Sequence, residues 1–153
     1  MAESKFVYVT YIRTTPEKLW RALREPEFTR KFWADTVQES DWIRGSSWKL
    51  VVPDGRVADD GEILEVDPCR RLVLTWLHRL RPEVSGEGPS VLTYTLEPMG
   101  EIVKLTVQHE MGIPDSMLIQ AVSGGWPMIL ASLKSLLETG EALPGSDRWP
   151  EGI

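Results

Sequence analysis

Residues 114–140, PDSMLIQAVSGGWPMILASLKSLLETG, decide the fold of this chain. Apolar side chains recur here at helical spacing and form one stripe: Leu118, Val122, Trp126, Ile129, Leu133, Leu136 and Leu137. Asp115 or Ser116 is suited to cap the first turn, and Gly140 is suited to end the helix. The segment therefore predicts one amphipathic helix of about 25 residues, which is about 37 Å long at the usual helical rise.

The middle of this helix contains an unusual run, Gly124–Pro127, with the letters GGWP. Proline removes one helical hydrogen bond, and the glycine pair weakens the turn before it. We expect a bend at this run. A loosened helix above a cavity can act as a ligand gate, whereas a static bend would only wrap the helix around a sheet.

The residues before the long helix predict strands and two short helices. Lys5–Arg13 (KFVYVTYIR) is rich in β-branched and aromatic residues and is typical of a strand. A short helix follows, with Thr14 and Glu17 as a capping box and a stop before Pro26, and a second short helix is expected over Glu27–Trp33.

The centre of the chain has short strand patterns separated by turn residues, which is typical of an antiparallel meander. The expected strands are Trp42–Ile43, Ser47–Val52, Arg56–Val66, Arg71–His78, Ser90–Glu97 and Ile102–Glu110. The segment Arg81–Pro89 contains two prolines and two glycines and is expected to be a loop. The prediction is an α+β fold in which a curved antiparallel sheet wraps around the long C-terminal helix, and such an arrangement leaves a cavity suited to a small apolar ligand.

Length and composition exclude several classes of protein. The 153 residues suit one domain, 1–153, with a core at about 5–143 and a tail at 144–153. A net charge of −6 argues against a nucleic-acid or anionic-membrane surface. With one cysteine, Cys69, and two well-separated histidines, no intrachain disulfide and no metal site are expected. No signal peptide or membrane span is visible, so we expect a cytoplasmic protein.

Four segments, taken in order, resemble one known family. They are TPEKLWRAL at 15–23, GEILEVDP at 61–68, RLVLTW at 71–76, and Gly125-Trp126 with the leucines that follow. Together they resemble the START-like (SRPBCC, helix-grip) superfamily over about residues 5–143. The branch is similar to the C-terminal domain of the heat-shock-protein-90 ATPase activator.

This resemblance implies a hydrophobic cavity between the sheet and the long helix, and no cofactor. Members of the superfamily bind lipids, sterols, polyketides or aromatic metabolites, and a few are cyclases, hydrolases or dehydratases. We therefore expect binding of a small hydrophobic or aromatic molecule. The alternatives are an enzyme acting on a cyclic or aromatic metabolite and a stress- or chaperone-associated interaction module, although nothing in these residues resembles the activator's separate N-terminal domain. A homodimer is also possible in such a family.

The candidate ligand-binding residues are mostly aromatic, and they are Trp33, Trp48, Trp76, Tyr94, His109, Met117 and Trp126. For the tryptophans the alternative is core packing, since an indole buries a large apolar area. Core packing is the expectation for Trp20, and a peripheral position is the expectation for Trp149.

The two histidines differ in their predicted setting. His109 alternates with Leu105 and Val107 and should face the apolar side of the sheet, close to Tyr94. There it could orient a polar group of a ligand or act as acid and base, or it could simply be a buried, hydrogen-bonded residue. His78, at a strand end, is the weaker candidate. Asp59 and Asp60 are adjacent on a strand and so cannot form a paired-carboxylate site. We assign no catalytic residue.

Overall fold

The structure is a computed structural model that describes residues 3–151. Seven strands form one antiparallel sheet in the order β1-β7-β6-β5-β4-β3-β2. The strands are β1 (Ser4–Ile12), β2 (Val37–Ser40), β3 (Ser47–Val51), β4 (Val57–Asp67), β5 (Arg71–His78), β6 (Ser90–Met99) and β7 (Ile102–Met111). The helices are α1 (Pro16–Ala22), α2 (Pro26–Phe32), α3 (Pro82–Ser85) and α4 (Met117–Thr139).

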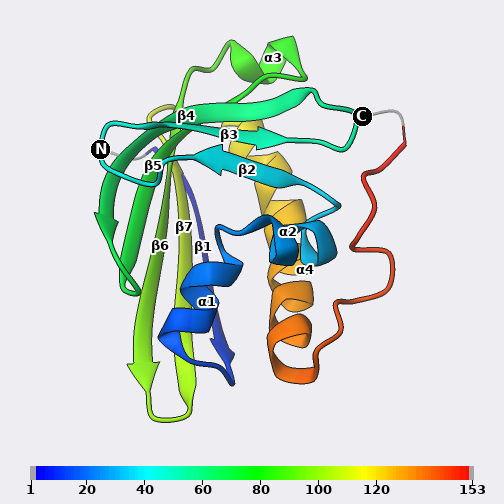
Figure 1. The fold of residues 1–153 in the computed structure, drawn as a ribbon. Coiled ribbons are helices and arrows are strands. Elements are labelled where there is room, and N and C mark those ends of the chain that lie inside the picture. The colour runs from blue at the N-terminus through cyan, green and yellow to red at the C-terminus, as the bar shows by residue number, and fades with distance from the viewer. Residues whose placement is uncertain (1–2, 152–153) are drawn as a thin grey trace.

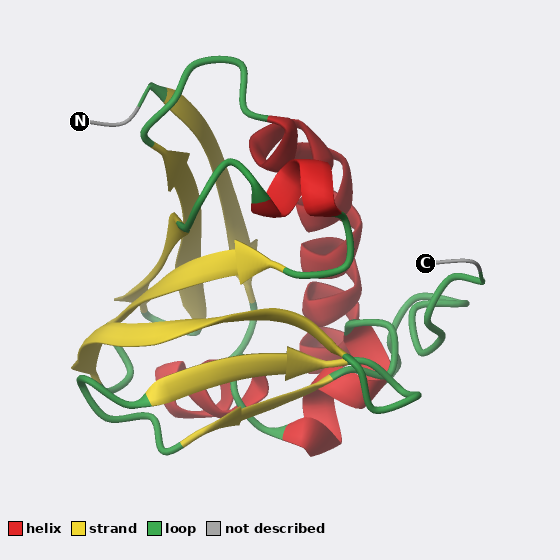
Figure 2. Cartoon of the chain, turned by 90° about the horizontal axis from the view of Figure 1, so that it is seen from above, coloured by secondary structure: helices red, strands yellow, loops and turns green. Residues whose placement is uncertain are grey.

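The sheet curves around the long helix, as the sequence predicted. Figure 1 shows α4 running along the sheet, with α1 and α2 at the open side between the first and second strands. The view from above shows the sheet bending so that its two halves enclose one side of α4 (Figure 2). The architecture is therefore α+β, and the hydrophobic core lies between the concave face of the sheet and α4.

Strict alternation in β7 builds part of the inner face of the sheet. Along β7 every second side chain from Val103 to Met111 is buried, and His109 belongs to this row. Tyr94 of β6 is also buried, on the strand paired with β7. The predicted placement of His109 on the apolar face is confirmed. Trp20, predicted to be a core residue, is buried as well, with 6% of its surface exposed.

The ends of α4 follow the predicted capping chemistry. The Ser116 side chain accepts a hydrogen bond from the Ile119 amide at 3.2 Å, and Gly140 ends the helix with a φ of 87°. Glycine suits this left-handed position because it has no Cβ to clash. The helix continues without interruption through Gly124–Pro127. Within residues 3–151, no helix is long and apolar enough to cross a membrane.

An irregular pairing of β4 with β5 shapes the cavity side of the sheet. The register shifts between Ile63 and Glu65, which is the mark of a β-bulge and bends the strand. Two residues earlier, a Cβ on Gly61 would lie 1.9 Å from the Thr75 carbonyl oxygen, so only glycine fits this close approach of the two strands.

Three local predictions were wrong. Trp42–Ile43 is not a strand, because Trp42 has a left-handed φ of 57°. The segment is a loop, in which the side chains of Ser40 and Ser46 hydrogen-bond to the backbone. The strand in this region is β2, which ends at Ser40. The N-cap of α1 is Thr15, whose side chain accepts from the Lys18 amide, rather than Thr14.

The third correction concerns Arg81–Pro89, which was expected to be a loop throughout. It contains the one-turn helix α3, because Pro82 supplies a favourable first helical position. Other element bounds differ from the expected ones by one or two residues; α2, for example, spans Pro26–Phe32 rather than Glu27–Trp33.

Candidate functional site

A cavity of about 420 Å³ lies between the sheet and the N-terminal half of α4. Its walls come from both layers, from α3 and from the C-terminal tail: Trp33, Leu50, Asp59, Trp76, His78, Arg81, Val84, Leu118, Ala121, Val122, Gly125, Trp126, Ile129 and Trp149. Most of these side chains are apolar or aromatic. The volume falls within the range of about 300–1,000 Å³ typical of small-molecule pockets.

Three tryptophans from distant parts of the chain meet at the cavity wall. Trp33 follows α2, Trp76 lies on β5 and Trp126 lies on α4. The ring centroid of Trp33 lies 6.1 Å from that of Trp76 and 5.3 Å from that of Trp126. All three side chains are at least 94% buried. Packing therefore holds the three rings rigidly, and the parts of them that reach the cavity form an aromatic section of its wall.

Hydrogen bonds donated by the indole nitrogens fix two of these rings. The Trp126 indole donates to Nδ1 of His109 at 3.2 Å, and the Trp76 indole donates to Oδ1 of Asp59 at 2.7 Å. A buried indole N–H without a partner would be costly, so each ring is held in one orientation. This part of the wall is formed before any ligand arrives.

His109 is part of this framework. The Ser90 hydroxyl donates to the Trp76 carbonyl, so it accepts from Nε2 of His109 at 2.8 Å, and Nδ1 is left to accept from Trp126. Burial lowers the pKa of His109 from 6.5 to about 3. The imidazole is therefore neutral near pH 7, and both of its nitrogens are occupied.

The polar groups of the cavity lie at the ends of β4 and β5 and just beyond. Nδ1 of His78 lies 2.8 Å from Oδ1 of Asp59, the same oxygen that accepts from Trp76. Burial raises the pKa of Asp59, and the hydrogen bonds from His78 and Trp76 oppose that rise. Arg81 also lines the cavity, and its guanidinium is paired with Glu83 at 3.1 Å.

The loop that carries Arg81 and Val84 is attached to the start of α4 through Glu87. The Glu87 carboxylate accepts from the Ser116 hydroxyl at 2.7 Å and from the Met117 and Leu118 amides at 2.7 and 3.2 Å. Burial opposes ionisation of Glu87, but these three hydrogen bonds outweigh it and lower its pKa. A carboxylate at a helix N-terminus satisfies amides that lack helical partners and suits the helix dipole.

Six of the seven candidates from the sequence gather in one aromatic cluster. Trp33, Trp76 and Trp126 line the cavity itself. The other three candidates, Trp48, Tyr94 and His109, lie behind that wall, with ring centroids 4.8 Å from Trp76, 6.1 Å from Trp126 and 5.2 Å from Trp76, respectively. The seventh, Met117, lies at the first turn of α4, is 39% exposed and does not line the cavity.

Tyr94 has an unusual environment for a tyrosine. Its ring packs edge-on against Trp126, and its hydroxyl is buried with no hydrogen-bond partner among residues 3–151. Burial alone raises its pKa far above the usual range. The hydroxyl therefore stays protonated and neutral, and it does not contribute to the cavity lining.

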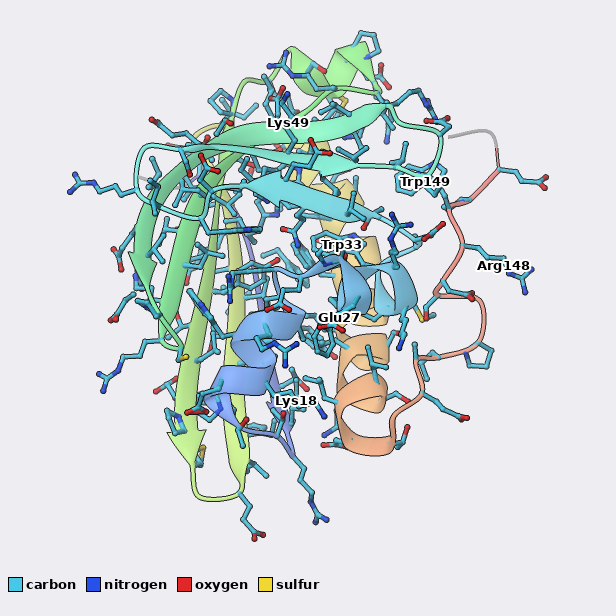
Figure 3. All side chains as sticks on the ribbon, viewed as in Figure 1. Lys18, Glu27, Trp33, Lys49, Arg148 and Trp149 are labelled. Carbon is cyan, nitrogen blue, oxygen red and sulfur yellow. The ribbon has the colours of Figure 1, made fainter. Side chains whose placement is uncertain are left out.

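Sequence reasoning missed Asp59, ranked His78 below His109, and placed Trp149 at the periphery. Trp149 in fact lines the cavity, so that expectation was wrong. In Figure 3 its side chain points toward the body of the molecule, whereas that of Arg148 beside it points outward. The tail has no periodic pattern that could have signalled this.

Among the described residues, no group of three or more His, Cys, Asp or Glu side chains could hold a metal ion.

Comparisons with known proteins agree with this architecture. The sequence profile described as "Activator of Hsp90 ATPase homolog 1-like protein" matches residues 13–138. The protein MLL2253 from Mesorhizobium loti is similar in structure, with a TM-score of 0.73, 29% identity, and coverage of 88% of this chain and 96% of its own. No curated protein is similar enough in sequence to count as a match.

Two further solved structures share the fold at lower identity. The Aha1 dimer from Colwellia psychrerythraea has a TM-score of 0.70 and 20% identity, covering 91% of this chain and 99% of that one. An HSP90 activator from Plasmodium falciparum also has a TM-score of 0.70 and 20% identity, covering 87% and 95% of the two chains.

Proposed function

This chain belongs to the Activator of Hsp90 ATPase homolog 1-like family, and from that premise we propose that it binds a small hydrophobic or aromatic molecule in the cavity between the sheet and α4. The observation that carries the proposal is the wall section made by Trp33, Trp76 and Trp126 at one side of a cavity of about 420 Å³. Of the other candidates, Trp48, Tyr94 and His109 support this wall from behind.

Pre-organisation supports ligand binding over simple core packing. A core that only stabilises the fold is packed with few voids larger than a water molecule. Here the indoles of Trp76 and Trp126 are fixed by Asp59 and His109 around a space that no described side chain fills. A ligand entering this space would lose little free energy to reordering of the wall.

Native mass spectrometry of the purified protein tests this proposal when the ligand is unknown. The proposal predicts an additional mass of a few hundred daltons that is lost on denaturation, or, for a protein purified empty, an increase in Tm with 2-methoxynaphthalene as an apolar aromatic probe. An empty native mass together with an unchanged Tm across a panel of such probes would overturn the proposal.

The family description and the Plasmodium structure also name an Hsp90 activator. Stimulation of an Hsp90 ATPase by this chain is therefore the alternative function. The two functions separate experimentally: stimulation that is unchanged when 2-methoxynaphthalene saturates the cavity would place the activity on the outer surface rather than in the cavity.

We also propose a homodimer and a cytoplasmic location. The relative from C. psychrerythraea is described as a dimer, and the edge strand β1 exposes Val7, Val9 and Tyr11, each 43–47% accessible. Cytoplasmic location is supported by the single cysteine, Cys69, which is free. Sedimentation velocity at several concentrations tests the dimer, and one monomeric species throughout would contradict it.

A further inference from the structure

Two polar side chains of the cavity form a cross-strand pair that the aromatic wall does not require. Asp59 of β4 and His78 of β5 are direct register partners, so their side chains lie on the same face of the sheet. Both residues line the cavity. Asp59 is 4% exposed, and the His78 side chain is 18% exposed.

The hydrogen bonds of this pair determine the state of His78. Oδ1 of Asp59 already accepts from the indole of Trp76, and it lies 2.8 Å from Nδ1 of His78. An ionised carboxylate can only accept a hydrogen bond from the ring. Nδ1 therefore carries a proton, and in the neutral ring Nε2 has a free lone pair. Within residues 3–151 no hydrogen bond reaches Nε2 of His78.

We propose that Nε2 of His78 is the polar anchor of the cavity and that the ligand is an aromatic molecule bearing an acidic hydroxyl group, a phenol or an enol. This inference rests on the proposed function and names the ligand class for the same cavity. The aromatic body packs against the tryptophan wall, and the hydroxyl donates its hydrogen bond to Nε2. Asp59 acts as a positioning residue, because it fixes the tautomer and the orientation of the imidazole.

The charges around His78 favour a neutral hydroxyl over a carboxylate. Asp59 is a buried carboxyl group in direct contact with the ring, and a second anion beside it would be repelled in a setting of low polarity. The guanidinium of Arg81 is the one cationic group in the lining of the described residues, and Glu83 already pairs with it. Its side chain is also 52% exposed, so water screens its charge.

The hydrogen bond to Nε2 of His78 would mainly distinguish ligands that carry a hydroxyl group from ligands of the same shape that lack one. A ligand of the same shape without a hydroxyl would remove water from Nε2 and leave it without a donor. Sites built around a hydrogen bond reject such analogues because a buried polar group is left unpaired.

The test compares two probes of the same aromatic body, 2-naphthol and 2-methoxynaphthalene, in the wild-type protein and in His78→Phe. In the wild type, 2-naphthol should bind about fivefold to tenfold more tightly, which is the usual net effect of one buried hydrogen bond. In His78→Phe this preference should vanish, because 2-methoxynaphthalene no longer leaves a buried Nε2 unpaired and should bind at least as tightly as in the wild type. Its binding also shows that the cavity is intact.

A measurement on the wild-type protein guards against misfolding of the variant. The ¹⁵N resonance of Nε2 in His78 should shift toward a hydrogen-bonded nitrogen when 2-naphthol binds, and it should not shift in that direction when 2-methoxynaphthalene, which offers no donor, binds. The resonances of the buried His109 should not distinguish the two probes.

The outcomes separate this inference from the proposed function. Equal affinity for both probes in the wild type would overturn the hydroxyl anchor and leave ligand binding in the cavity standing. Tighter binding of 2-naphthoate than of 2-naphthol, abolished by Arg81→Gln, would overturn the anchor in favour of the guanidinium. Binding of none of the three probes would overturn the proposed function and this inference with it.

Discussion

The indole nitrogen of Trp126 donates a hydrogen bond to Nδ1 of His109 across 3.2 Å, and this bond connects α4 to the inner face of β7. On its other side His109 is bonded to Ser90, so the imidazole joins the helix to two neighbouring strands. The arrangement explains a histidine that is completely buried. His109 sets the position of Trp126 in the cavity wall and has no nitrogen left for a ligand.

The buried neutral state of His109 predicts that the protein loses stability in acid. Its pKa is about 3 in the folded chain, against 6.5 when exposed. Between these values the unfolded chain binds more protons, so the contribution of His109 is fully present above pH 6.5 and is lost as the pH falls toward 3. His109→Gln should reduce the slope of unfolding free energy against pH in this window by up to about 1.4 kcal/mol per pH unit.

Urea denaturation at several pH values measures this slope. The comparison is between slopes, because His109→Gln also weakens the bond to Trp126 and lowers stability at every pH. The same slope in variant and wild type would mean that His109 is already protonated in the fold, or that its environment is more polar than the structure indicates.

Tyr94→Phe should leave stability unchanged or raise it by up to about 1 kcal/mol, because it removes a buried hydroxyl that has no partner among residues 3–151. Binding of 2-methoxynaphthalene should not change. Tyr11→Phe, on the outer face of β1 where Tyr11 is 47% exposed, is the matched control. A loss of probe affinity in Tyr94→Phe alone would show instead that its hydroxyl reaches the ligand.

Glu87→Gln should destabilise the protein by about 1 kcal/mol, in the range of a lost helix cap. The neutral amide is a poorer acceptor for the Ser116 hydroxyl and the two amides that Glu87 now satisfies. Glu83→Gln is the control on the same loop, since it weakens an exposed pair with Arg81 and leaves the contacts of Glu87 intact. Hydrogen exchange at residues 81–89 should become faster in Glu87→Gln only, and equal effects of both variants would contradict the role of Glu87.

Trp149→Ala should weaken probe binding, because the tail then no longer closes this part of the cavity wall. Loss of about 30 Å² of apolar contact lowers affinity about threefold. Arg148→Ala is the neighbouring control, and its side chain points away from the molecule (Figure 3). Fluorescence titration measures both variants, and equal affinity in the two would remove Trp149 from the binding site.

Much of the fold could be predicted because its signals are local. The N-cap candidates Asp115 and Ser116, the C-terminal glycine at Gly140 and the stripe between them all belong to one segment. The structure confirms the glycine and the stripe, and of the two cap candidates it selects Ser116. The alternation of β7 likewise placed His109 on the inner face. The aromatic candidates lie together because the inner faces of the strands and the apolar face of α4 pack against each other in the core.

The Asp59–His78 pair could not be predicted because it depends on the bulge. Counting back from the β4–β5 turn, where Asp67 pairs with Arg71, a regular hairpin would place Asp60 opposite His78. The register shift between Ile63 and Glu65 moves the pairing by one residue, so Asp59 lies there instead. A bulge depends on tertiary packing, and the alternation of apolar residues along a strand does not reveal where it occurs.

A pair of substitutions on α4 tests ligand binding in the cavity most directly. Gly125 lines the cavity and Gly124, its neighbour, is exposed. At both positions, apart from the adjacent residues and the backbone of α4 itself, a Cβ would meet nothing within 4 Å. Gly125→Leu and Gly124→Leu therefore make the same change in helix propensity, but only the first places a side chain where the ligand should bind.

Affinity for 2-methoxynaphthalene, measured by titration of both variants and the wild type, is the decisive quantity. If the ligand binds in this cavity, Gly125→Leu should bind the probe at least about tenfold more weakly, while Gly124→Leu should bind it as the wild type does. Equal affinities in all three proteins would show that the probe does not bind in this cavity and would contradict the proposed function.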